Sequence, residues 1–256
     1  ARVPELGGDR VAAALATASD SCPAAGLTSV HEAGISQDAI GLYKRLIDDG
    51  RLKLRIYAML GDPGEGDIAG YFRKNRLDGY AGHRLDVRSV KLFIDGAMGS
   101  RGAALFEPYS DRPGYSGLLV NTPEHVEAVA RAALDTGFQV AIHAIGDKGN
   151  RIVLDAFERA LKDRPATDHR FRIEHAQVVS APDFARFKEL GVLPSMQPTH
   201  ATSDMPWAEA RLGPERVKGS YAWRSFLDIG CIVPCGSDFP VEEIHPILGI
   251  YAGITR

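Results

Sequence analysis

QVAIHAIGD, residues 139–147, is the stretch that points most directly to the fold. A short apolar run leads to His143, and a loop then opens at Gly146. The parallel strands of α/β barrels present functional side chains at their carboxyl ends in this way. Two later apolar stretches end similarly, on His175 and on Asp238. These three strand ends are therefore candidates for one shared site.

Strand-like and helix-like segments alternate along the chain after a leading helix at 9–25. Strands are predicted at 27–31, 53–60, 89–94, 138–143, 170–175, 192–197 and 231–237. Helices are predicted at 36–50, 124–137, 148–164, 180–190 and 214–229, with a last helix beginning near Pro246. Alternation of this kind predicts a parallel sheet in an α/β fold.

A (β/α)8 barrel is the favoured architecture, although it requires eight strands and seven are predicted. We expect the missing first strand to lie upstream of these residues. The alternative is an open doubly wound sheet, which needs a glycine-rich phosphate loop after its first strand. The residues at that place, LTSVHEAG (27–34), do not match such a loop. A glycine-rich stretch at 95–117 reads as a long loop, and such loops often serve function.

Composition argues against several classes of function. The 256 residues are 45% hydrophobic and 25% charged, and the net charge of −3 does not indicate a nucleic acid partner. No run of about 18 apolar residues predicts a membrane span. The three cysteines form no CxxC pair, which fits a reducing, cytoplasmic location. The chain starts at Ala1 without a methionine, so a removed signal peptide is also compatible with the sequence.

Four residues in or at the ends of predicted strands are the candidates for chemistry: Lys91, His143, His175 and Asp238. Their spacings of 52, 32 and 63 residues correspond to one βα unit plus the long loop, one unit and two units, since a unit takes about 30 residues. Histidine and aspartate together suit a borderline divalent cation such as zinc. Each residue alone has a plainer interpretation: a satisfied core histidine, a turn aspartate, or a lysine that is exposed on an edge strand or paired with Asp95. The regular spacing favours a shared site.

Four motifs carry a resemblance to a known family. They are VKLFIDGAMGS (90–100), AIHAIGD (141–147), FRIEHAQ (171–177) and CGSDFPV (235–241). Together they resemble the amidohydrolase superfamily, specifically its YtcJ-like branch, the amidohydrolase 3 group that includes N-substituted formamide deformylases. The resemblance implies a TIM barrel of the metal-dependent hydrolase type. The implied reaction is cleavage of an amide-type, non-peptide C–N bond in a small molecule by metal-activated hydroxide.

The resemblance also implies roles for individual residues. Lys91 would carry a CO2-derived carbamate that bridges two divalent metal ions, most typically zinc, although one ion could also bind. His143 and His175 would match the metal ligands of barrel strands 5 and 6. Asp238 would match the strand-8 aspartate, which binds metal, accepts a proton from the attacking water and passes it to the leaving nitrogen. This makes Asp238 the expected catalytic residue.

Four further residues are weaker candidates for contacts to the substrate or to the metal ligands. Asp95 and Arg101 follow the strand of Lys91, and Asp147 follows His143. His200 follows the strand at 192–197. Asp147 is equally well explained as a carboxylate at a helix N-terminus, and His200 as a loop histidine.

One departure from the family pattern limits the expectation for this chain. The family carries a His-x-His pair at the end of strand 1, and no two of the eight histidines here are two residues apart. The accessory β-sandwich is missing as well. We therefore interpret residues 1–256 as a single incomplete barrel domain, strands 2–8 with their helices, from a longer protein.

Two other functions stay open at this point. One is a truncated or degenerate barrel that binds a ligand or partner without catalysis. The other is a metal-free lyase with Lys91 as a Schiff-base amine, which would leave the two histidines and Asp238 unexplained. The expected partner is a small amide-type substrate, with no nucleic acid and no membrane, and a homodimer is the default assembly.

Overall fold

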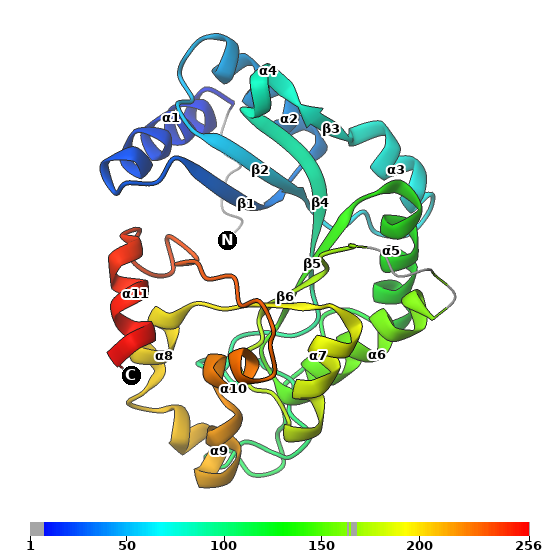
Figure 1. The fold of residues 1–256 in the computed structure, drawn as a ribbon, viewed down its shortest axis with the longest axis vertical. Coiled ribbons are helices and arrows are strands. Elements are labelled where there is room, and N and C mark those ends of the chain that lie inside the picture. The colour runs from blue at the N-terminus through cyan, green and yellow to red at the C-terminus, as the bar shows by residue number, and fades with distance from the viewer. Residues whose placement is uncertain (1–7, 163, 165–167, 256) are drawn as a thin grey trace, which may run out of the picture.

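Six parallel strands form a curled sheet in the structure, a computed structural model that describes residues 8–162, 164 and 168–255. In spatial order they are β1 (Ser29–Ile35), β2 (Arg55–Leu60), β4 (Leu85–Phe93), β5 (Gln139–Ala144), β6 (Arg172–His175) and β7 (Leu193–Ser195). Strands that follow one another in this order along the chain are neighbours in the sheet, as in a barrel wall. A short strand, β3 (Leu77–Gly79), pairs antiparallel with β4. The sheet curves without closing, because β1 and β7 end the strand order among the described residues (Figure 1).

Helices connect the strands, and the longer ones have clear sequence signals. They are α1 (Gly8–Ala24), α2 (Gln37–Asp48), α3 (Ile68–Asn75), α4 (Tyr80–His83), α5 (Pro123–Thr136), α6 (Asp147–Leu161), α7 (Phe184–Leu190), α8 (Pro198–Asp204), α9 (Ala208–Arg216), α10 (Trp223–Asp228) and α11 (Pro246–Thr255). Short 3-10 turns occupy Ala181–Asp183 and Val217–Gly219. The side chains of Ser36 and Thr122 cap α2 and α5. Gly137 ends α5 in the left-handed conformation at φ 69°.

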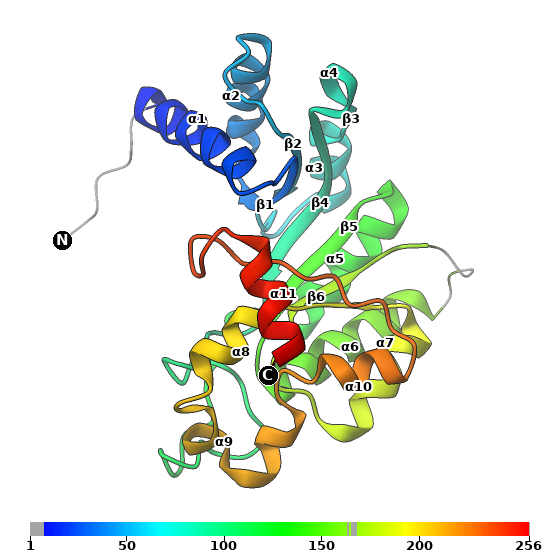
Figure 2. The same ribbon diagram turned by 60° about the vertical axis from the view of Figure 1, so that its left-hand side comes forward.

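The two faces of the central strands differ in polarity. Val90, Leu92, Val140 and Ile142 are fully buried in the main hydrophobic core. Successive side chains of a strand point to opposite faces, so Lys91 on β4 and His143 on β5 point to the other, concave face. The apolar face is covered by α5 and α6, while α8 and α11 lie on the other side of the sheet (Figures 1 and 2). The curled sheet therefore buries its apolar side chains outward and gathers polar ones inside the curve.

The structure confirms most of the predicted elements and corrects two. The strand predicted at 231–237 is an extended segment with one parallel bridge, between Cys235 and Met196. The neighbouring strand β7 has only three residues, and in the described part of the chain no strand pairs with the far side of the extended segment. A strand needs such pairing, so the local apolar pattern is insufficient here.

The region predicted as one helix at 214–229 instead holds the end of α9, a 3-10 turn and α10. Gly213 interrupts α9 with φ 76° and ψ 168°. Tyr221 adopts φ 51°, and its backbone N–H donates to the carbonyl of Gln177 at 2.8 Å. A tertiary hydrogen bond therefore replaces the helical one at this point. None of the helices in the described residues has the length and apolar character needed to cross a membrane.

Candidate metal centre

Three imidazoles and one carboxylate form a continuous row at the carboxyl ends of the strands. The rings of His143 and His175 meet edge to face, with centroids 4.6 Å apart. The rings of His175 and His200 stack at 5.8 Å. His200 Nε2 lies 3.9 Å from Asp238 Oδ2. Three of the predicted residues, His143, His175 and Asp238, are thus brought into one place, with His200 between two of them.

Lys91 lies next to this row on β4, a central strand with β2 and β5 on its two sides. Its side chain is buried, and Nζ is 3.5 Å from the centre of the Phe93 ring and 3.1 Å from the carbonyl oxygen of Leu92. Burial lowers the pKa of Lys91 to about 8, partly offset by the negative charge of Glu174 and Asp238. The lysine is therefore neither exposed on an edge strand nor paired with Asp95, the two plainer interpretations of the sequence.

The two strand-end histidines are neutral in this environment. Burial, followed by the nearby positive charge of Lys91, lowers the pKa of His143 to about 4. Burial also holds the pKa of His175 well below its ordinary value. Nδ1 of His175 is 2.7 Å from Oε1 of Gln197. The amide oxygen only accepts, so Nδ1 donates, and Nε2 of His175 keeps its lone pair for a cation.

Asp95 acts as a linker between two loops at the strand ends. Its buried carboxylate accepts backbone N–H groups of Ala104 at 2.9 Å, Ile145 at 3.0 Å and Gly146 at 2.8 Å. Burial raises the pKa of Asp95 to about 7, and the three N–H groups oppose this rise. Oδ1 also lies 3.6 Å from His143 Nε2. Asp95 thus joins the loop after β4 to the loop after β5, beside a candidate ligand.

The other two weak candidates bind the loops and not the row of histidines. Asp147 accepts the backbone N–H groups of Phe106 at 3.0 Å and Lys148 at 2.8 Å. Arg101 makes two hydrogen bonds to Asp111, at 3.0 and 2.8 Å. These contacts account for both side chains structurally, and their roles toward a substrate stay predictions.

Two members of the row have unusual backbone conformations. His175 has φ 76° and Asp238 has φ 58°. Residues other than glycine seldom adopt this left-handed region, and such residues cluster at functional sites. The conformation re-aims each side chain at the point where its strand or extended segment ends. Sequence patterns carry no signal for this, because neither residue is a glycine.

A buried polar network on the concave face was not anticipated from the sequence. Arg172 donates from Nη1 to Nδ1 of His31, 2.9 Å away, which joins β6 to β1 across the sheet. Nε of Arg172 lies 3.2 Å from Oε1 of Glu174. Burial, followed by the positive charge of Arg172, lowers the pKa of His31. The sequence FRIEH did carry a signal for this network. Its charged residues alternate with apolar ones, and a strand buried among apolar side chains on both faces would not contain two charged residues.

The side chains in the row fit a divalent cation. Nε2 of His143 and Nε2 of His200 are buried and have no hydrogen-bond partner in the described part of the chain. Leaving a buried polar atom without a partner is unfavourable. Neutral imidazoles and a carboxylate are the ligands that zinc takes in proteins. His175, His200 and Asp238 form a set whose ligand atoms all lie within 4.8 Å of one another.

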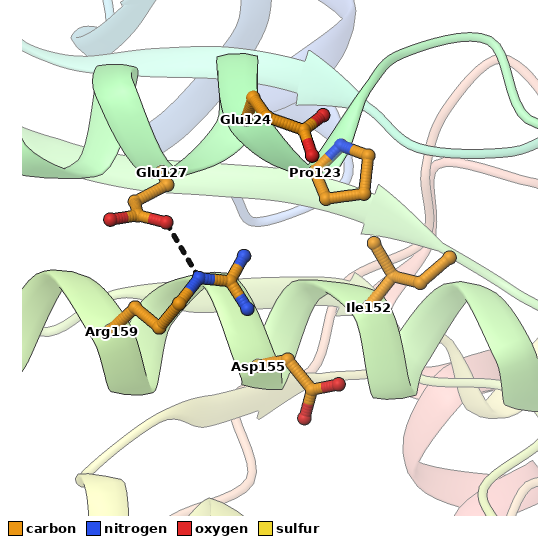
Figure 3. Close-up of a pocket in the computed structure, with 6 residues that line it drawn as sticks. All are labelled: Pro123, Glu124, Glu127, Ile152, Asp155 and Arg159. Carbon is orange, nitrogen blue, oxygen red and sulfur yellow. Dashed lines mark hydrogen bonds and ion pairs between the residues drawn. The ribbon is translucent and has the colours of Figure 1, made fainter.

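A separate hollow of about 270 Å³ lies between α5 and α6. It is lined by Pro123, Glu124, Glu127, Ile152, Asp155 and Arg159 (Figure 3). An ion pair between Arg159 Nε and Glu127 Oε2, 2.6 Å apart, crosses it. This hollow belongs to the outer helical layer, so it offers nothing to the residues at the strand ends.

Comparison with known proteins places this geometry in context. A family model described as "Amidohydrolase family" matches residues 1–256. The chain is 31% identical to the protein called "Putative amidohydrolase YtcJ" of Bacillus subtilis (strain 168), over 99% of this chain and 47% of that protein. It is 42% identical to Protein LONG AFTER FAR-RED 3 of Arabidopsis thaliana over 67% of this chain and 30% of that protein. It is 25% identical to an N-substituted formamide deformylase of Arthrobacter pascens, over 91% of this chain and 43% of that protein.

Solved structures agree with these matches. An uncharacterized metal-dependent hydrolase from Pyrococcus furiosus superimposes with a TM-score of 0.86 and 33% identity, over 98% of this chain and 51% of that one. The chain therefore spans about half the length of this structure, and less than half that of the three related proteins. The resemblance seen in the four motifs is confirmed.

Proposed function

We propose that this chain, which belongs to the amidohydrolase family, contributes strands 2–8 of a metal-dependent hydrolase barrel that cleaves an amide-type, non-peptide C–N bond. The observation that carries the proposal is the convergence of His143, His175 and Asp238 at the strand ends, beside the buried Lys91. Four residues separated by long stretches of sequence meet in one place. The similar solved structure, described as a metal-dependent hydrolase, supports the metal-dependent hydrolase part of the proposal.

A divalent cation, most typically zinc, would polarise the substrate carbonyl and lower the pKa of water to about 7. Lys91, His143, His175 and Asp238 are the residues that would hold one or two such ions. Lys91 would do so as a carbamate, because CO2 converts its amine into an anionic oxygen ligand. The buried position of Lys91 supports this assignment, since burial favours the uncharged amine that reacts with CO2.

Asp238 would carry out the proton transfers. Its side chain is 40% exposed, so a substrate and a water molecule have access to it. The carboxylate would accept a proton as the water oxygen attacks the carbonyl carbon. It would then deliver that proton to the nitrogen as the C–N bond breaks, acting first as general base and then as general acid. Burial raises the pKa of Asp238, and a raised pKa helps the protonated carboxyl group to act as the general acid toward the leaving nitrogen.

The other residues of the site would position these groups. Gln197 fixes the ring of His175, and Asp95 fixes the loop that follows His143. The substrate class is small molecules with an amide-type carbonyl. We further propose that residues 1–256 form one barrel domain and that the remaining strand and the accessory β-sandwich belong to other parts of a longer protein. Those parts would supply the His-x-His pair.

Metal analysis combined with Lys91→Ala tests this proposal. We expect this chain to retain a divalent cation after dialysis and the longer protein to hydrolyse N-substituted amides. Lys91→Ala should lower kcat of the longer protein at least 100-fold, on the scale found for other catalytic groups. The proposal is wrong if the longer protein binds no divalent cation and Lys91→Ala leaves its properties unchanged. Metal bound without turnover would instead favour a barrel that binds its ligand without catalysis.

A further inference from the structure

His200 is the member of the row that the sequence offered only as a weak candidate for contact with the substrate or the metal ligands. It lies in the first turn of α8, directly after β7. Its side chain is 13% exposed, and its Nε2 atom is buried without a hydrogen-bond partner among the described residues. Asp238 Oδ2 lies 3.9 Å from that nitrogen, beyond hydrogen-bond distance. The two polar atoms thus lie close together without a hydrogen bond between them.

His175 completes the arrangement from the other side. Its ring stacks on that of His200 at a centroid distance of 5.8 Å and an interplanar angle of 17°. The hydrogen bond from Nδ1 to Gln197 leaves the Nε2 lone pair of His175 free. One ligand atom from each of His175, His200 and Asp238 can be chosen so that all three lie within 4.8 Å of one another.

Two side-chain links hold β6 and α8 at a set separation. Gln197, the residue before α8, binds the ring of His175. Gln177, two residues after His175, donates from Nε2 to Oδ2 of Asp204 at 3.0 Å, near the end of α8. The helix that carries His200 is therefore linked to the segment around His175 at two points, one just before α8 and one at its end. Such outer contacts are typical of metal ligands, whose orientation they set.

We propose that His200 is a metal ligand and that His175, His200 and Asp238 hold one divalent cation of the zinc class. This inference rests on the proposed function for the premise that the protein binds a metal. It adds His200 to the ligands, and the cation held by His175, His200 and Asp238 would need no residue outside this chain. Three protein ligands with a fourth position left open are characteristic of catalytic zinc sites.

The distances are compatible with such a site after a small closure. Zinc binds imidazole nitrogen and carboxylate oxygen at about 2.1 Å, which places two tetrahedral ligand atoms roughly 3.4 Å apart. The ligand atoms here are within 4.8 Å of one another, and the pair from His200 and Asp238 is 3.9 Å apart. Asp238 is the most exposed of the three residues and lies outside regular structure, so it has the freedom to move inward.

Titration of this chain with Co²⁺, a coloured substitute for zinc, tests the ligand set directly. His200→Ala should weaken Co²⁺ binding at least 30-fold and change the visible absorption band. His83→Ala is the matched control, because His83 is exposed, pairs with Asp86 and lies at the opposite end of the strands. It should leave both the affinity and the spectrum unchanged.

A second measurement needs no substitution and so does not depend on the folding of a variant. Long-range ¹H–¹⁵N spectra of the histidine rings, recorded as Zn²⁺ is added, should shift Nε2 of His200 and Nε2 of His175 together. The proposal is overturned if the His200 nitrogens do not shift while His143 does, or if Lys91→Met abolishes Co²⁺ binding and His200→Ala leaves it intact. In those two cases the metal-dependent hydrolase stands with its original ligands. If the unmodified chain and the longer protein bind neither metal, both proposals fail.

Discussion

The two halves of the candidate site are built in different ways. Lys91 and His143 lie within regular, paired strands, and Phe93 opposite His143 belongs to the same ladder. In the second half, His175 ends the paired strand β6 with a left-handed backbone, Asp238 has a left-handed backbone outside the strands, and His200 comes from a helix. The first half is positioned by the main-chain hydrogen bonds of the sheet. The second half depends in addition on side chains such as Gln197, which binds the ring of His175.

This difference shows where rigidity comes from in each half. Backbone pairing sets the separation of β4 and β5. What remains variable in the first half is the conformation of the loops that follow these two strands. The second half depends on individual side-chain contacts, any of which one substitution can remove. We therefore expect substitution of a residue that supports the first half, such as Asp95, to act mainly on stability, and substitution of one that supports the second half, such as Gln197, to act mainly on metal affinity.

The largest effect is expected for Asp95→Ala, which breaks the first half. It leaves the buried N–H groups of Ala104, Ile145 and Gly146 without their acceptor. The free energy of unfolding should fall by about 4 kcal/mol, since each buried unsatisfied group costs roughly 1–3 kcal/mol. Urea unfolding followed by circular dichroism measures this loss.

Asp147→Ala is the control for that experiment. Asp147 accepts two backbone N–H groups in a less buried place, so we expect a loss of roughly 1–2 kcal/mol. Equal losses for Asp95→Ala and Asp147→Ala would contradict the special role of Asp95 in the first half.

An intermediate effect is expected from pH in the metal-free chain. The pKa of His143 is about 4 in the folded protein, against an ordinary value of 6.5. The unfolded chain therefore binds a proton that the folded one excludes, and stability is lost as pH falls from 6.5 to 4. The loss due to His143 is roughly 3 kcal/mol.

Comparison of the unmodified chain with His143→Gln isolates that contribution. With a chelator present, the difference in unfolding free energy between the two proteins should change by that amount between pH 7 and pH 4. A difference that stays constant over this range would show that His143 is protonated as easily in the folded chain as in the unfolded one.

The smallest effect is expected for Gln197→Ala, which loosens the second half. Without the amide oxygen the ring of His175 loses its fixed orientation. Metal affinity should fall about 10-fold, as for other partners of metal-bound histidines, while stability changes little. Gln139→Ala is a matched control, because Gln139 bonds to Tyr57 at the opposite end of β5. If the two glutamine variants bind Co²⁺ equally well, Gln197 has no orienting role.

Much of the fold could be predicted because its strands have strong local patterns. Val90 and Leu92 alternate with Ser89 and Lys91, and the structure places this run in β4 as expected. The strand predicted at 231–237 failed because strand formation also depends on neighbours that the local pattern does not reveal. The helix predicted at 214–229 failed for a related reason, since Tyr221 bonds to a distant segment.

The candidate site could be predicted in part. The proximity of Lys91, His143, His175 and Asp238 could be predicted because the carboxyl ends of parallel strands meet at one end of a barrel, while their roles stay predictions. The position of His200 between His175 and Asp238 could not be predicted, because it depends on how α8 docks against β6. The link between Arg172 and His31 was equally hidden, since it joins residues 141 positions apart.

The amino-acid sequence by itself determined the alternation of strands and helices, the apolar outer face of the sheet and the family to which the chain belongs. These properties follow from local periodicity and from motifs that can be read in order. Only the tertiary structure decided which side chains meet, how far apart they lie and which nitrogen atoms stay without a partner. The physical reason is that strand curvature, helix docking and the backbone angles of His175 and Asp238 are set by contacts between distant segments.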